Sequence, residues 1–373
     1  MRSKFSAIQG VMLLSGAALF SMLAQSAVLP RIDLPKDSPV AVLGSDYGDS
    51  HESARGGALV LDLHAALSLR NSSQRRIRGI TLLVTAHEVT PGGKGSVTVS
   101  SLDIAPGETF PVRIDLRLLR PLQAGSGAPV QVGLDGVLFD DFSFYGPDRL
   151  SSRRMLTVAE WEARRDRRYF KALVAEGGPQ KLQHEMMEIL ARQTVRPDLD
   201  VQVVRGARAT NFDPEHEVQF AFLQLPDSPV EPKDGTARVA GNEARAPRLE
   251  VTNRSNRPIR YLEIGWILQD RQGREFLAGS VPADLSLAPG QKSQILKDTT
   301  LKFPQRPGLA IAGMTGFVSN VEFTDGSIWI PSRSDLADPR FQKIITTSAE
   351  EQRLVQLYQK RGLKALTEEL KKF

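Results

Sequence analysis

One apolar pattern occurs twice in this chain of 373 residues, at a constant spacing of 184 positions. Residues 137–147 read VLFDDFSFYGP, and residues 321–331 read VEFTDGSIWIP. The two segments share their valine, phenylalanine, aspartate, aromatic and proline positions. Matches at one constant spacing indicate an internal repeat. We therefore predict that one folding unit occurs twice in the chain.

The repeat extends on both sides of these segments, and several matches in order disfavour the alternative, chance similarity. Upstream, NSSQRRIR at 71–78 corresponds to NRSNRPIR at 253–260, and Ala-Pro-Gly at 105–107 recurs at 288–290. Downstream, the spacing of 184 holds for three further pairs: Gly178 with Gly362, Leu182 with Leu366, and Glu185 with Glu369.

Short alternating runs separated by turn residues fill the region 40–147 and are typical of an antiparallel β-sandwich. Proline followed by glycine at 106–107 and at 289–290 predicts a type II turn in each copy. Asp325-Gly326 predicts a two-residue hairpin, and the first copy lacks the glycine there. One strand face is expected to be apolar in both copies: Ile80, Leu82, Val84 and Ala86, then Leu262, Ile264, Trp266 and Leu268.

A helical period follows each predicted sandwich. Thr157 and Glu160 form a capping box that predicts a helix start, Gly178 ends that helix, and Pro179 begins the next. The second copy repeats the scheme, with a cap at Ser348 and Glu351 and a break at Gly362. Each copy is therefore expected to end in a helical hairpin.

The predicted fold is mainly β with α: a tandem duplication of an immunoglobulin-like antiparallel β-sandwich, each copy followed by a helical hairpin. A polar loop is expected at 231–247. The predicted segments are a signal peptide or N-terminal anchor (1–27), β-sandwich 1 (28–148), helical hairpin 1 (149–193), a linker with a short strand at 201–204 (194–217), β-sandwich 2 (218–336) and C-terminal helical hairpin 2 (337–373).

The N-terminus reads as an export signal. Arg2 and Lys4 precede an apolar run at 11–23, and small residues at 24–26 suit cleavage. An uncleaved anchor in the inner membrane is the alternative, because no charge occurs between Lys4 and Arg31. The expected location is periplasmic or extracellular.

Composition excludes several classes of protein. Hydrophobic residues at 41% and charged residues at 24% indicate globular domains. Loss of Arg2 and Lys4 with a signal would lower the net charge from +5 to +3, too little to indicate nucleic-acid binding. The chain has no cysteine, which excludes disulfides and thiolate chemistry.

The order of features in the second copy resembles FxLYD-like and other immunoglobulin-like modules of bacterial exported proteins. The residues that carry the resemblance are LEVTN at 249–253, Ile259, DRQG at 270–273 and LAPG at 287–290. The resemblance implies a fold and no activity. The first copy departs from it after Glu88, where PGG at 91–93 replaces DRQG.

The sequence contains no catalytic or cofactor motif that we can identify, so no cofactor is expected. His184 is followed by Glu188 where a zincin helix would carry its second histidine. Asp46, Asp49 and Glu52 supply oxygen ligands in a loop, but their spacing fits no EF-hand, and a solvated loop is the favoured interpretation.

Arginines are concentrated where the first predicted hairpin begins. Residues 149–168 contain seven arginines against three acidic residues, whereas the matching stretch 333–352 contains three basic and four acidic residues. Arginine suits bidentate recognition of carboxylate or phosphate. We expect Arg164, Arg165, Arg167 and Arg168 to bind an acidic protein or an anionic envelope component; a solvated helix face is the alternative.

The expected function is an exported, non-enzymatic binding or scaffold protein of the bacterial cell envelope. A carbohydrate-binding or hydrolytic envelope protein is the alternative, with Trp161, Trp266 and Trp329 as a possible sugar platform. The sequence indicates neither the ligand nor the oligomeric state.

Overall fold

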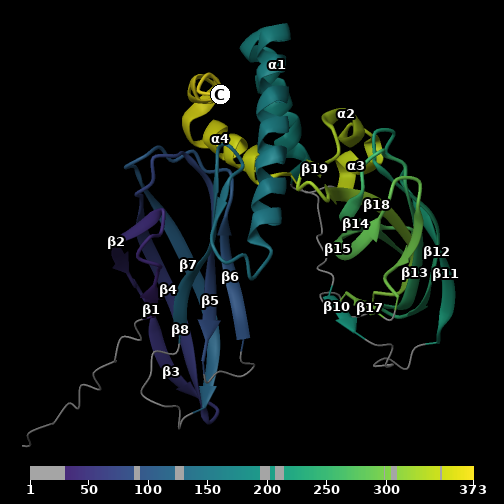
Figure 1. Ribbon diagram of the computed structural model, residues 1–373, viewed down its shortest axis with the longest axis horizontal. Coiled ribbons are helices and arrows are strands. Elements are labelled where there is room, and N and C mark those ends of the chain that lie inside the picture. Colours follow the sequence, from purple (N-terminus) through teal and green to yellow (C-terminus); the bar gives the residue numbers. More distant parts are fainter. Residues whose placement is uncertain are drawn as a thin grey trace, which may run out of the picture.

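A computed structural model describes residues 30–87, 93–121, 130–193, 202–205, 214–297, 299–303, 309–344 and 347–373. The protein is mainly β, with several sheets. Figure 1 shows two β-units with the long helix α1 standing between them. The predicted signal peptide lies outside the described residues. No helix within these residues is long and apolar enough to cross a membrane.

The first β-unit has two sheets around one core. β8 and β5 are central in one sheet, with β1 and β6 at its edges and β9 paired to β8. In the other sheet, β4 pairs with β2 and β3 on one side and with β7 on the other. The strands are β1 (Arg31–Asp33), β2 (Val40–Asp46), β3 (His51–Arg55), β4 (Ala58–Asn71), β5 (Ile77–Ala86), β6 (Gly93–Val99), β7 (Thr109–Pro121), β8 (Val130–Phe139) and β9 (Phe144–Tyr145).

The second β-unit forms one continuous series of paired strands around its own core. β11 joins two parts of the series, because its first half pairs with β12 and its second half runs parallel to β18. The strands are β10 (Gln202–Arg205), β11 (His216–Phe222), β12 (Val230–Ala240), β13 (Glu243–Asn253), β14 (Ile259–Asp270), β15 (Glu275–Leu287), β16 (Lys292–Ile295), β17 (Thr299–Lys302), β18 (Ile311–Phe323) and β19 (Ile328–Trp329).

Two predictions about this unit had different outcomes. The short strand predicted in the linker is β10, and it pairs with β17 of the second β-unit. The polar loop predicted at 231–247 is wrong, because β12 and β13 form a hairpin there. The charged residues of this segment do not indicate exposure, because Glu243 and Arg245 are buried and paired with each other at 3.0 Å.

The two β-units use the same strand register around the repeated sequence. Ile80 pairs with Val137 in the first unit, and Leu262 pairs with Val321 in the second. The predicted apolar face of the second copy is confirmed, since Leu262, Ile264, Trp266 and Leu268 are fully buried. In the first copy, Ile80, Leu82 and Val84 lie in the core, whereas Ala86 is only half-buried at the end of β5.

A buried asparagine organises the same turn in each unit. Asn71 Nδ2 donates to the carbonyls of Arg75 (2.8 Å) and Ile104 (3.1 Å). Asn253 Nδ2 donates to the carbonyls of Arg257 (2.8 Å) and Leu287 (2.9 Å). Each asparagine therefore ties one polar turn to a second segment. The predicted type II turns are also confirmed, with φ of 78° at Gly107 and 73° at Gly290.

The turn that follows β8 and β18 differs from the predicted two-residue hairpin. Phe323 N donates to Ser327 O at 2.9 Å, which leaves a three-residue loop with Gly326 at φ 83°. The first unit has the same loop with Phe142 at φ 62°. A positive φ is unfavourable for phenylalanine, but the Phe142 ring stacks on Trp161 at 4.9 Å. This packing offsets the strain.

Helix α1 (Ser152–Gln193) begins five residues before the predicted cap at Thr157. Asp148 explains the earlier start, because its carboxylate accepts the Arg153 amide at 2.9 Å. The buried carboxylate of Asp135 binds Ser152 Oγ and fixes the first turn from β8. Asp135 lies 17 residues before Ser152 in the sequence. No local sequence motif therefore reveals this cap.

The predicted helix breaks are confirmed. Gly178 has φ 70° and interrupts α1, and Gly362 has φ 79° and interrupts α4 (Ala349–Leu370), whose N-cap is Ser348. Two short helices, α2 (Arg333–Leu336) and α3 (Pro339–Ile344), precede α4.

α1 and α4 share one apolar core, which we call the helical cluster. α1 and α4 lie side by side (Figure 1) and pack through apolar residues of both. The buried members are Phe170, Leu173, Leu182, Met186, Ile189, Leu354, Val355, Leu366 and Leu370. The predicted helical hairpins are thus packed on each other, an arrangement that the sequence pattern does not indicate.

Candidate functional site

The four arginines predicted to bind a partner divide between two sites. Arg164, Arg167 and Arg168 line an open groove of about 590 Å³. Arg165 points to the other side of α1 and lines a cavity of about 290 Å³. We call these sites the basic groove and the junction cavity.

Basic side chains dominate the lining of the basic groove. There are six of them, and Glu160 is the one acidic side chain among the lining residues. β5, α1 and the residues after α4 contribute to it, so segments far apart in sequence meet there. The lining residues are Arg78, Glu160, Trp161, Arg164, Arg167, Arg168, Lys171, Lys372 and Phe373.

Glu160 cannot neutralise its surroundings. Its buried carboxylate faces the guanidinium groups of Arg164 at 2.8 Å, Arg167 at 3.5 Å and Arg78 at 3.8 Å. Burial lowers the pKa of Arg78, and the positive charge of Arg167 lowers it further against the opposing effect of Glu160. Arg78 also pairs with Asp103 at 2.6 Å, and Arg167 pairs with Glu350 at 2.9 Å. The arginines at the floor of the groove therefore have carboxylate partners.

Two cations of the groove are exposed and lack acidic partners. Arg168 donates only to the Arg164 carbonyl, at 3.2 Å, and Lys171 makes no ion pair within the described ranges. Arg164 is held by the carbonyl of Asp140 and by the ring of Phe142. Arg168 and Lys171 are therefore the side chains best placed to reach a ligand.

The alternative interpretation of the arginine-rich stretch, a solvated helix face, does not hold for Arg165 and Arg167. Arg167 is 4% exposed and donates to Glu350 at 2.9 Å, so it joins α1 to α4. Arg165 donates to the carbonyl of Pro331 at 3.0 Å. Sequence reasoning missed Arg78, which lies more than eighty positions upstream, because only the fold brings β5 to α1.

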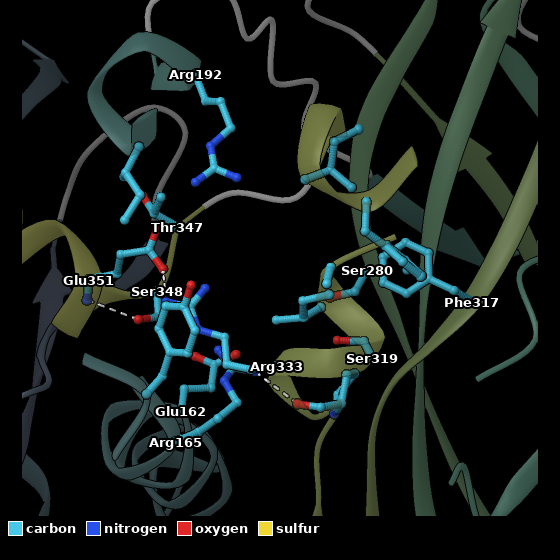
Figure 2. Close-up of a pocket in the computed structure, with 18 of the residues that line it drawn as sticks. Glu162, Arg165, Arg192, Ser280, Phe317, Ser319, Arg333, Thr347, Ser348 and Glu351 are labelled. Atoms are coloured by element: carbon cyan, nitrogen blue, oxygen red, sulfur yellow. Dashed lines mark hydrogen bonds and ion pairs between the residues drawn. The ribbon is translucent and has the colours of Figure 1, made fainter. Parts of the chain in front are cut away.

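The junction cavity lies between α1, the sheet of the second β-unit, and α2 to α4. Figure 2 shows its two walls: Arg165, Arg333 and Glu162 on the helical side face Ser319 and Phe317 on the sheet side. One wall is thus charged, and the other is largely apolar.

Glu162 is the unusual group in this cavity. Burial raises the pKa of its carboxyl to about 7, against the effect of Arg165, and Asp166 and Glu263 raise it further. A carboxyl of this kind changes charge near neutral pH. It is a candidate for binding a cation or for proton exchange.

Side chains with catalytic potential are not arranged as a known catalytic set in the described part of the chain. His64 Nδ1 and Asp115 Oδ1 are 2.8 Å apart on the surface, but the nearby Ser50 Oγ binds the His64 backbone instead of its ring. No group of three or more His, Asp or Glu residues there is placed to hold a metal ion. Of the candidate calcium ligands, Glu52 pairs with Arg120 at 2.9 Å.

The three tryptophans do not form one surface. Trp266 is fully buried in the second core, Trp329 packs against that core, and Trp161 stacks on Phe142 beside the basic groove. A shared sugar platform is not formed by these residues.

Comparisons with known proteins identify no family. No protein-family model matches the chain, and no curated protein matches it. A Northeast Structural Genomics Consortium target, SoR45, is 8% identical over 29% of this chain and 79% of its own, with a TM-score of 0.20. pT26-6p is 10% identical over 89% of this chain and 72% of its own, with a TM-score of 0.16. A beta-glucosidase from Kluyveromyces marxianus is 10% identical over 70% and 45%, with a TM-score of 0.16. Similarities this weak support no argument about function.

Proposed function

We propose that this protein is an exported, non-enzymatic binding protein of the bacterial cell envelope, and that its basic groove binds an anionic envelope component. The observation that carries the proposal is a groove lined by six basic side chains and one acidic side chain, in which Arg168 and Lys171 are exposed. A concave surface of one charge attracts ligands of the opposite charge and raises their rate of association.

We also infer that the chain arose by tandem duplication of an immunoglobulin-like sandwich with its helical hairpin. The equal strand register, the paired asparagines and the glycine breaks at Gly178 and Gly362 support this origin. The resemblance to FxLYD-like modules of exported proteins agrees with it.

Divergence between the copies supports the choice of the groove as the binding site. At the constant spacing, Arg168 corresponds to Gln352 and Lys171 to Val355. Val355 is buried in the helical cluster, whereas Lys171 is exposed. The fold therefore does not require the two cations that face the groove.

The proposed location rests on a separate feature. The apolar segment at 11–23 is typical of an export signal and favours delivery to the envelope.

Replacing Arg168 and Lys171 by glutamine should weaken binding of poly-L-glutamate at least about tenfold, since the two unpaired cations are removed. Binding to the wild type should also weaken as salt rises from about 50 to about 500 mM, because salt screens exposed charges. Fluorescence anisotropy of the labelled polymer measures both effects.

The matched control replaces Arg254 and Arg271, which are exposed on the second β-unit, by glutamine. It removes the same charge away from the groove and should change affinity less than about twofold. Equal losses in the two variants would mean that the polymer senses only net charge. Unchanged binding in the groove variant, with its fold intact, would contradict the proposed site.

A further inference from the structure

The junction cavity is separate from the basic groove and has its own ligand requirements. It is enclosed by α1, by β14, β15 and β18, and by the segment from α2 to α4. Its volume of about 290 Å³ is near the lower end of small-molecule sites. It therefore suits a compact organic molecule.

The three guanidinium groups of the cavity already have acceptors. Arg165 donates to Asp166 at 2.9 Å, Arg192 donates to Glu185 at 3.2 Å, and Arg333 lies 3.1 Å from Asp166. Arg333 also pairs with Glu351. An anionic ligand would have to displace these carboxylates, so the arginines do not indicate an anion site.

Glu162 is different from the other two carboxylates of the cavity. Glu185 and Glu351 accept hydrogen bonds from Arg192 and Arg333, whereas Glu162 accepts none from any side chain or backbone group in the described residues. A carboxylate that lines a cavity without a donor is an acceptor site for a ligand.

The charged groups around Glu162 come from every neighbouring element. Arg165 and Asp166 lie on its own helix, and Glu263 approaches from β14. The other charged groups that line the cavity form two pairs: Arg333 of α2 with Glu351 of α4, and Arg192 with Glu185 in the part of α1 after Gly178. No neighbouring cation hydrogen-bonds to Glu162, so a ligand cation would supply the missing partner.

The opposite wall is shaped for apolar contact. Leu277, Phe317 and Phe341 line it, and the Phe317 and Phe341 rings meet edge to face at 5.1 Å. Gly265 is required beneath the Phe317 ring, because a Cβ there would lie 2.3 Å from a ring carbon. The ring consequently lies close against the sheet, and space remains in front of it.

We propose that the junction cavity binds a compact organic amine, whose ammonium group pairs with Glu162 while its apolar part packs against Phe317 and Leu277. The ligand is thereby oriented from the charged helical wall to the apolar sheet wall (Figure 2). A cation at this position also offsets the cost of ionising a half-buried carboxyl.

The test uses the full chain and three probes of similar shape: 2-phenylethylamine, 2-phenylethanol and phenylacetate. Isothermal titration calorimetry at about pH 8 should show the amine binding at least about tenfold more tightly than the alcohol or the acid. Glu162→Gln should remove this preference. Glu188→Gln, which changes an exposed residue of the same helix, should leave it unchanged.

Protonation supplies a second measurement. Because the pKa of Glu162 is raised to about 7, the carboxylate predominates at about pH 8 and the neutral acid at about pH 6. Affinity for the amine should therefore fall about tenfold between these pH values in the wild type, and should not change in Glu162→Gln. That variant should melt at the same temperature as the wild type or higher, since it removes a half-buried carboxyl that is costly to ionise.

A second variant tests whether the ligand occupies the cavity, without changing the charge of the site. Ser319→Leu should weaken amine binding by narrowing the cavity from the sheet side. Tighter binding of phenylacetate than of the amine, equal amine binding by Glu162→Gln, or no saturable heat from any of the three probes would each overturn the proposal.

Discussion

Replacing Glu350 by leucine should lower the free energy of unfolding by about 3–5 kcal/mol, because it leaves a buried guanidinium without its partner. Glu350 is fully buried, and its carboxylate accepts hydrogen bonds from Arg167 at 2.9 Å and from Arg353 at 2.8 and 3.0 Å. Without it, the nearest carboxylate to Arg167 is Glu160, at 3.5 Å. Glu160 already faces other guanidinium groups, so it cannot replace the lost partner.

Urea unfolding followed by circular dichroism measures this loss. Glu368→Leu is the control, since Glu368 pairs with Lys371 at the exposed surface and its loss should change stability very little. The double variant Arg167→Leu, Glu350→Leu should recover part of the stability, because neither charge then remains unpaired. A loss below about 1 kcal/mol for Glu350→Leu would show that α1 and α4 are not joined by this pair.

The second large effect is expected at the matched phenylalanines Phe139 and Phe323. Changing either residue to alanine should lower the free energy of unfolding by about 3–5 kcal/mol, the usual loss for a buried aromatic side chain. Phe139 is fully buried and Phe323 is 6% exposed. The guanidinium carbon of Arg75 lies 3.8 Å from the centroid of the Phe139 ring, and that of Arg257 lies 3.9 Å from the centroid of the Phe323 ring. Each variant therefore loses a core side chain and a cation–π contact.

Hydrogen exchange followed by mass spectrometry locates the damage. Phe139→Ala should raise exchange in the first β-unit, and Phe323→Ala in the second, because each ring lies in a separate core. Leu43→Ala is a control at a residue that is 56% exposed, and it should change neither unit. Equal changes in both units after either phenylalanine substitution would contradict the assignment of two cores.

Local sequence signals predicted the proline–glycine turns and the helix breaks, but not the length of the loop at Asp325-Gly326. Gly107 and Gly290 adopt positive φ in turns that their preceding prolines indicate. Gly178 and Gly362 interrupt their helices at the residues where the apolar pattern changes. These features depend on a few neighbouring residues, so the sequence contains the necessary information.

Features that depend on distant segments were not predictable in this way. Arg167 reads as a surface residue in a charged stretch, but its partner Glu350 is 183 positions away and both are buried. The hairpin of β12 and β13 reads as a loop for a similar reason, since Arg245 is neutralised inside the protein by Glu243. Charge alone does not distinguish an exposed side chain from a buried pair.

The two candidate sites also differ in how far the sequence predicted them. The charge asymmetry between the copies predicted a basic surface at Arg164 and Arg168, and both line the groove. The junction cavity was not predicted, because the pKa of Glu162 is raised mainly by burial and to a smaller extent by Asp166 and Glu263. Only the packing of α1 against the second β-unit brings the sheet wall and Glu263 near Glu162.

Capture of native envelope material tests the role of the basic groove most directly. The immobilised wild type and the variant with glutamine at Arg168 and Lys171 would be exposed to solubilised envelopes at low and high salt, and bound components identified by mass spectrometry and carbohydrate analysis. We predict that the wild type retains an anionic component at low salt, releases it at high salt, and that the variant retains none. Equal retention by the folded variant, or retention by the wild type that salt does not reduce, would contradict anion binding at the groove.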